Sequence, residues 1–176
     1  MNYIDHATQA GLTEAYAATR MANPLFHQFC ELPICRHMQL EESLQLFSCF
    51  DVVQGKSGEI IYASGSDTDK TMRLIVSGSV TVSSPSYGIY SHLGPGDVFS
   101  LFSFLDESRL HSATVTAEQD STMLCIQREY FNLITVEDAG LGNLLLRFMF
   151  RLLSQMSLKM ESEYAAMHYY VSGRRI

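Results

Sequence analysis

The sequence has few basic residues and no long apolar run, and each of these shortages argues against one class of protein. Lys and Arg total 12 against 19 Asp and Glu, which gives a formal net charge of −7. This balance disfavours a nucleic-acid-binding surface, because a phosphate backbone is repelled overall. The longest apolar stretch, residues 144–153, is interrupted by Arg147 and Arg151. We therefore expect no membrane span.

The N-terminus also lacks the apolar core of a secretory signal, since it is polar and contains Asp5 and His6. The expected location is cytoplasmic, where four cysteines are expected to be thiols or ligands rather than disulfides. Tryptophan is absent, but 47% of the 176 residues are hydrophobic and 18% are charged. That is the composition of a soluble globular protein that is long enough to bury a sizeable core.

Between residues 50 and 127 the apolar pattern has a period of two, with a glycine at most of the breaks. Several short strands at this spacing predict a sandwich or barrel. The candidate strands are Phe50–Gln54, Glu59–Ala63, Met72–Ser77, Ser79–Ser84, Gly88–Leu93, Val98–Phe99, Ser112–Ala117 and Met123–Ile126.

Helical patterns flank this region on both sides. Residues 3–22 predict a helix that Asn23-Pro24 ends. Two short helical stretches follow within residues 25–50. The first has Phe26, Phe29 and Cys30 at helical spacing, and the second has Leu40, Leu44, Phe47 and Phe50 on one face.

After the strands, residues 128–135 predict a short helix and residues 137–168 a long one, with Glu137 and Asp138 in its first turn. An apolar stripe runs along the long helix at three- and four-residue spacing. The stripe either covers the barrel or pairs with a second copy of the chain, and the length of the helix favours a dimer seam. Its members are Leu145, Met149, Leu152, Leu153, Met156, Met160, Tyr164 and Met167.

The stretch from Leu93 to Val115 is the most distinctive. It begins with the turn Gly94-Pro95-Gly96-Asp97, continues through a short apolar run and a polar loop, and ends in His111-Ser112-Ala113-Thr114-Val115. This order resembles the phosphate-binding cassette of cyclic-nucleotide-binding domains of the catabolite activator and fumarate-nitrate regulator (CRP/FNR) family. Gly58–Gly65 and Ile75–Val82 resemble the early strands of the same family, and the resemblance covers residues 25 to 165.

In that family, backbone N–H groups of the short helix and an Arg hold a cyclic phosphate, and a Glu accepts from the ribose hydroxyl. Here Ser100-Leu101 stands at the family's Gly-Glu, and His111 stands at its Arg. Leucine accepts no hydrogen bond, and a neutral imidazole lacks the guanidinium fork. We therefore expect little or no affinity for cyclic AMP. The degenerate cassette comprises Ser100, Leu101, Phe102, Ser103, Arg109, His111 and Ser112, with Arg109 as the nearest replacement cation.

Cys30, Cys35 and Cys125 are placed similarly to cysteines of the oxygen-sensing branch of the family, which holds an iron–sulfur cluster with four thiolates. The fourth cysteine, Cys49, matches no ligand of that branch, and buried cysteines without ligands are common. The six histidines show no metal-ligand spacing, and Ser77-Gly78-Ser79 is a hairpin turn without the surroundings of a catalytic serine. We predict neither an enzyme, nor a cofactor, nor a metal.

The sequence therefore predicts an α+β, mainly β fold: a cyclic-nucleotide-binding-like β-roll or jelly roll with N-terminal helices and a long C-terminal dimerisation helix. The predicted parts are a helical extension (1–24), the β-roll (25–136), and the long helix with a short tail (137–176). The family's transcription factors continue into a helix-turn-helix domain, for which we see no counterpart.

The predicted function is that of a non-enzymatic signalling module. It acts as a homodimer on a protein partner and not on DNA, with Met149, Leu152, Leu153, Met156 and Met160 at the dimer interface. Two alternatives stay open. One is a sensor that binds a non-standard nucleotide or other small anion in the β-roll. The other is an iron–sulfur or thiol redox sensor.

Overall fold

The structure is a computed structural model that describes residues 21–106 and 110–171. The chain divides into two compact units, residues 1–130 and 131–176. The helix predicted over 3–22 lies outside the described residues apart from its C-terminal end, and Arg109 lies outside them as well.

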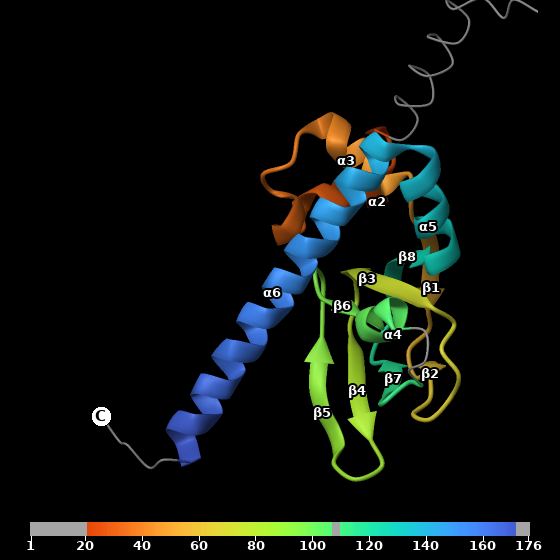
Figure 1. The fold of residues 1–176 in the computed structure, drawn as a ribbon. Coiled ribbons are helices and arrows are strands. Elements are labelled where there is room, and N and C mark those ends of the chain that lie inside the picture. The colour runs from red at the N-terminus through yellow and green to blue at the C-terminus, as the bar shows by residue number, and fades with distance from the viewer. Residues whose placement is uncertain (1–20, 107–109, 172–176) are drawn as a thin grey trace, which may run out of the picture. The chain divides into compact units, whose positions relative to one another are not determined.

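The first unit is built on two four-stranded antiparallel sheets (Figure 1). Their eight strands confirm the predicted β-roll, and their bounds lie within a few residues of the sequence pattern. In order across the first sheet they are β1 (Asp51–Gly55), β8 (Ser121–Gln127), β3 (Thr71–Ser77) and β6 (Val98–Phe99). In order across the second they are β2 (Ile60–Tyr62), β7 (Thr114–Ala117), β4 (Val80–Ser84) and β5 (Gly88–Leu93).

The interior of the roll is an apolar cluster to which both sheets contribute. Because side chains alternate along a strand, every second residue of each strand reaches this interior. Burying such side chains is the main stabilising contribution to the fold, at about 25 cal/mol per Å² of apolar surface. The fully buried members are Ile75, Val80, Phe99, Val115, Met123 and Cys125.

From residue 21 onward, where the description of the chain begins, two helices and a 3-10 turn precede the strands: α2 (Pro24–Glu31), η1 (Pro33–Cys35) and α3 (Leu40–Phe47). The Asn23 side chain caps α2 by accepting from the Leu25 N–H at 2.9 Å. Phe26 and Phe29 are buried, and their rings lie 5.4 and 5.7 Å from that of Phe47. These aromatic contacts hold α2 against α3.

The predicted apolar face of the second helical stretch is wrong in part. Leu40 is 52% exposed, and Phe50 lies beyond the end of α3. The buried side chains of the helix are Ser43, Leu46 and Phe47. Since α3 ends at Phe47, a face drawn from Leu40 to Phe50 follows a helix that does not extend that far.

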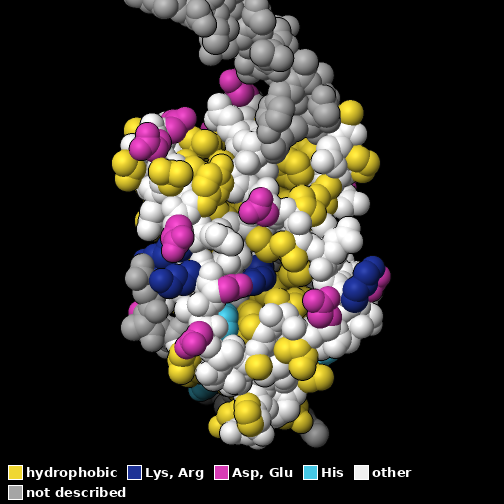
Figure 2. All heavy atoms as spheres, turned by 90° about the vertical axis from the view of Figure 1, so that its right-hand side faces the viewer, with side chains coloured by type: hydrophobic (Ala, Val, Ile, Leu, Met, Phe, Trp, Pro, Cys, Tyr) yellow, Lys and Arg dark blue, Asp and Glu magenta, His cyan; other side chains and the backbone are white. Residues whose placement is uncertain are grey.

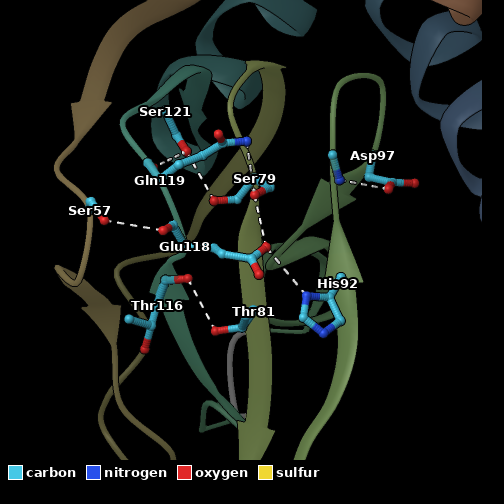
Figure 3. A network of polar contacts seen from close by, with 10 residues as sticks. Ser57, Ser79, Thr81, His92, Asp97, Thr116, Glu118, Gln119 and Ser121 are labelled. Atoms are coloured by element: carbon cyan, nitrogen blue, oxygen red, sulfur yellow. Dashed lines mark hydrogen bonds and ion pairs between the residues drawn. The ribbon is translucent and has the colours of Figure 1, made fainter.

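A turn of Ser77, Gly78 and Ser79 joins β3 to β4 and packs on the β7–β8 turn (Figure 3). The Ser79 hydroxyl donates to Glu118 Oε2 at 2.9 Å, and the Ser121 hydroxyl donates to the Ser79 carbonyl at 3.1 Å. Gly78 has a φ of +83° and sits so close to Ser121 that there is no room for a side chain. The two turns therefore interlock through a glycine.

The second unit contains most of α5 (Arg128–Glu137) and all of α6 (Ala139–Val171). The prediction that Glu137 begins the long helix is wrong, because Glu137 ends α5. Asp138 lies between the helices, where its side chain accepts from the Leu141 N–H at 3.0 Å. Gly142 lies against Thr135, so α5 and α6 approach closely at this point. None of the helices in the described ranges is both long and apolar enough to cross a membrane.

Candidate functional site

The cassette-like segment follows β6 and forms a turn and a short helix, α4 (Leu101–Leu105). Ser100 begins the helix with a left-handed backbone, φ +62° and ψ +12°. Its carbonyl accepts from the Phe104 N–H at 2.9 Å and from the Ser103 hydroxyl at 3.1 Å. The short helix that the family resemblance implies is thus present, and its first turn is held by these contacts.

The predicted cassette residues do not all face the same way. Leu101 is 2% exposed and Ser103 is buried, whereas Phe102 is 51% exposed and Ser112 is exposed. Leu101 therefore packs in the interior, whereas Phe102 lies at the surface. Arg109, the predicted replacement cation, lies outside the described residues.

His111 is buried and fixed on several sides. Its ring stacks on the ring of Tyr62, with 3.7 Å between the centroids and 10° between the planes. Its backbone N–H donates to the Ser66 carbonyl at 3.1 Å, and its carbonyl accepts from the Gly65 N–H at 2.7 Å. Burial lowers the pKa of His111 below its ordinary value; the Asp69 carboxylate opposes that shift, and the Arg73 charge adds to it. At neutral pH the ring is therefore uncharged.

Arg73 is the main residue that the sequence analysis missed. It stands in the middle of β3, opposite Cys125 of β8 and Phe99 of β6. Opposed residues of an antiparallel pair point to the same face, and Cys125 and Phe99 belong to the interior cluster. Arg73 therefore projects into the roll, on the same side of β3 as Ile75, and only 9% of it is exposed.

The guanidinium of Arg73 is held by Asp69 and by its own strand. One nitrogen donates to Asp69 Oδ1 at 3.2 Å and to the Thr71 carbonyl at 3.0 Å, and the other pairs with Asp69 Oδ2. Partial burial raises the pKa of Asp69, but the hydrogen bond and the charge of Arg73 outweigh burial and leave that pKa below its ordinary value. The Arg73 side chain is 11% exposed and that of Asp69 is 50% exposed, so the pair connects the interior to solvent.

Tyr62 lies among these groups at the end of β2. Burial raises its pKa, while the nearby Ser100 hydroxyl and the Arg73 charge lower it. Ser100 is close enough to influence Tyr62 without meeting the geometry of a hydrogen bond, and its buried Oγ has no hydrogen-bond partner among the described residues. We call this group the inner polar cluster; its members are Arg73, Asp69, His111, Tyr62 and Ser100.

The thiols are not brought together as a metal site would require. Among the residues that the structure describes, no three His, Cys, Asp or Glu side chains gather as metal ligands. Cys125 lies in the interior of the roll, where burial raises its pKa to about 11. A thiol with this pKa is protonated at neutral pH and is a poor nucleophile and ligand.

We predict that Cys125 lowers the stability of the fold in alkali. Above pH 9.0, the ordinary thiol pKa, the unfolded chain loses this proton while the folded chain keeps it until about pH 11. Stability therefore falls as the pH rises through this window, by about 2–3 kcal/mol for a shift of this size. Urea unfolding between pH 8 and 11 should show a shallower decline for Cys125→Ala than for the native chain. Parallel declines would contradict the prediction.

The predicted interface residues of the long helix fall into two groups. Met149 and Leu152 are buried within the chain, at 5% and 1% exposure. Leu153 and Met156 are partly exposed, and Met160 is 57% exposed. Only the second group is available in this structure for contact with another molecule.

Two four-stranded sheets with a turn and short helix after β6 and a long helix at the C-terminal side make up the fold of cyclic nucleotide-binding domains. Residues 52–138 match the family model described as the cyclic nucleotide-binding domain, and this part of the chain belongs to that family. No curated protein sequence matches the chain significantly.

Solved structures of the same fold include a cyclic nucleotide-binding domain from Methylobacillus flagellatus. It is 22% identical, with a TM-score of 0.66 and 86% of each chain covered. The regulatory subunit of a cAMP-independent protein kinase A from Trypanosoma brucei is 19% identical, with a TM-score of 0.62 over 86% of this chain and 50% of that one. The c-di-GMP responsive global regulator of Xanthomonas campestris is 12% identical, with a TM-score of 0.62 over 77% of this chain and 66% of that one.

Proposed function

We propose that the chain is a non-enzymatic regulatory module of the cyclic nucleotide-binding fold that does not respond to ordinary cyclic AMP or cyclic GMP. The observation that carries the proposal is the state of the two key cassette positions. His111, at the family's Arg position, is buried and stacked on Tyr62, and Leu101, at its Glu position, is buried at 2% exposure. Neither side chain can replace the family's charged contacts.

The loss of affinity follows from these two positions. A guanidinium makes two parallel hydrogen bonds to a phosphate, and a neutral imidazole makes at most one without the charge. Removing one partner of a buried charged hydrogen bond costs roughly 2–5 kcal/mol. Since about 1.4 kcal/mol is tenfold in affinity, the loss of both contacts moves a micromolar site to the millimolar range or weaker.

Calorimetric titration with cyclic AMP and with cyclic GMP tests this proposal. We expect no micromolar binding by the native chain. The double variant Leu101→Glu, His111→Arg should gain affinity if the cassette backbone still fits a cyclic phosphate. His111→Arg alone is the matched control, because it restores the phosphate contact without the ribose contact, and it should gain less. Micromolar binding of either nucleotide by the native chain would refute the proposal.

The fold is compatible with signalling that does not use cyclic AMP. One structural neighbour is described as a subunit of a cAMP-independent kinase, and another as responsive to c-di-GMP. These descriptions concern those proteins; here they support the view that this fold accommodates different ligands. We propose that this module signals as a homodimer through α6, and that it contacts another protein.

The charge of the chain favours a protein partner over DNA. The net charge is −7, and few basic residues are present to replace the counterions of a phosphate backbone. On the face drawn in Figure 2, the described Lys and Arg side chains form small groups beside acidic ones and no continuous basic surface. Tyr169 and Tyr170 are exposed near the end of α6. Exposed aromatic residues of this kind are enriched at protein interfaces, and they support the proposed contact.

A further inference from the structure

The stability of the fold does not explain why an arginine lies inside the β-roll. Arg73 occupies a position of β3 whose neighbours on the same face are Ile75, Phe99 and Cys125. Taking a charge out of water is costly, and replacing a buried ion pair by apolar side chains of similar size is often neutral or stabilising. The pair with Asp69 offsets the cost of burying Arg73 but does not explain why an arginine is there.

We propose that Arg73 is the anion-binding group of this β-roll, and that Asp69 is an internal competitor that occupies it until a ligand carrying a phosphoryl group takes its place. The inference rests on the proposed function, because it supplies the cation that the cassette lacks at His111. The cation that binds the phosphoryl anion is then Arg73 of β3 and not Arg109 of the polar loop.

The geometry of the pair supports an exchange of anions. Asp69 engages both terminal nitrogens of Arg73, which is the two-pronged contact that a phosphate would make. The Asp69 side chain is 50% exposed, so water can solvate the carboxylate once it is displaced. The Arg73 side chain is only 11% exposed and keeps the Thr71 carbonyl as a fixed partner. The arginine is thus the buried member of the pair. The carboxylate also accepts from the Thr71 N–H at 3.1 Å, but it is the more exposed member, and it is the one that leaves in this proposal.

The rest of the inner polar cluster suits a phosphoryl group better than a carboxylate. The buried Ser100 Oγ is without a hydrogen-bond partner in the described residues, and a hydroxyl is a ready donor to a further phosphate oxygen. Tyr62 stacks on His111 and is near enough to both Ser100 and Arg73 for each of them to lower its pKa. Both carboxylate oxygens of Asp69 are used by the Arg73 guanidinium. A tetrahedral phosphoryl anion has further oxygens, which can accept from the Ser100 hydroxyl as well.

Titration with inorganic phosphate, followed by NMR at the Arg73 Nε–H resonance, tests the proposal on the full chain. Ionic strength is held constant with chloride, and the resonance is assigned by its loss in Arg73→Lys. We expect phosphate, but not acetate at equal concentration, to shift this resonance in the native chain. Asp69 competes at high effective concentration because it is tethered close to Arg73, so Asp69→Asn should tighten phosphate binding by about tenfold or more.

Asp67→Asn is the matched control, because it removes the same charge from an exposed position two residues away. It should change phosphate affinity by less than about twofold, the effect of general charge alone. Arg73→Met removes the reporting resonance, so this variant is followed at the backbone amide resonances; it should abolish their response to phosphate while leaving the chain folded, as checked by circular dichroism. Ser100→Ala should weaken phosphate binding relative to the native chain.

Three results would overturn the inference. They are phosphate shifts that spare the Arg73 resonance, an Asp69→Asn variant no tighter than Asp67→Asn, and phosphate binding that survives Arg73→Met. Failure here is distinguishable from failure of the proposed function. If phosphate does not bind and the cyclic nucleotides do not bind either, the proposed function stands and only this inference is wrong. Micromolar cyclic AMP binding that persists in Arg73→Met would refute both.

Discussion

Gly78→Ala should destabilise the β-roll by about 3–5 kcal/mol, a large part of the stability of a typical domain. Two physical effects add at this position. The φ of +83° costs an L-residue roughly 1–2 kcal/mol. A Cβ would also lie 2.5 Å from the Asp120 carbonyl oxygen and 2.6 Å from Ser121 Cα, which are backbone atoms that cannot move aside alone. The interlocked turns of Figure 3 would have to separate.

Gly88→Ala is the matched control for this experiment. Gly88 also has a positive φ, +64°, but nothing lies within 4 Å of a Cβ built there. It should cost only the conformational term, roughly 1–2 kcal/mol. Urea unfolding followed by circular dichroism gives both values. If Gly78→Ala is no worse than Gly88→Ala, the close approach of the two turns is not a determinant of stability.

The same glycines explain why so much of the fold was predictable. Most strand ends in this chain coincide with turns that contain glycine or short polar residues, so the apolar segments between these turns predicted the strands to within a few residues. The helix boundaries were less predictable where no such residue marks them. Glu137 and Asp138 both favour a helix start. Nothing in the sequence shows that Glu137 instead ends the preceding helix. That choice depends on how closely α5 and α6 pack at Gly142, which is a tertiary effect.

The inner polar cluster was only partly predictable. His111 and Leu101 could be found, because they replace charged residues at recognisable positions of a motif. Arg73 and Asp69 lie outside that motif, and their pairing depends on which face of β3 meets the other sheet. One signal was present: a charged residue at the centre of the otherwise apolar Thr71–Ser77. A charge at that place in a strand buried on both faces indicates a partner nearby, but the sequence does not say whether that partner is a side chain or a ligand.

The second half of α6 should form the seam of a homodimer. The helix has 33 residues, but its buried side chains end at Leu152. Beyond that point large apolar side chains remain exposed, among them Met160 at 57%, Tyr164 at 63% and Met167 at 59%. With Leu153 and Met156 they repeat at three- and four-residue spacing, the pattern of a coiled-coil seam. An exposed stripe of this length on a regular helix favours pairing with a second copy, because pairing buries both stripes at once.

We therefore expect the native chain to be a dimer at micromolar concentration and Met160→Glu to raise its dissociation constant by a hundredfold or more. A carboxylate in the seam is buried without a partner and faces its own copy across the two-fold axis, which costs several kcal/mol. Leu158→Glu is the control, because Leu158 is 62% exposed but lies on the opposite face of the helix at 100° per residue. Sedimentation velocity over a concentration series should show a dimer for the native chain and for Leu158→Glu, and a monomer for Met160→Glu. A native monomer at tens of micromolar, or equal effects of the two substitutions, would remove the seam from the second half of α6, and the proposed signalling dimer with it.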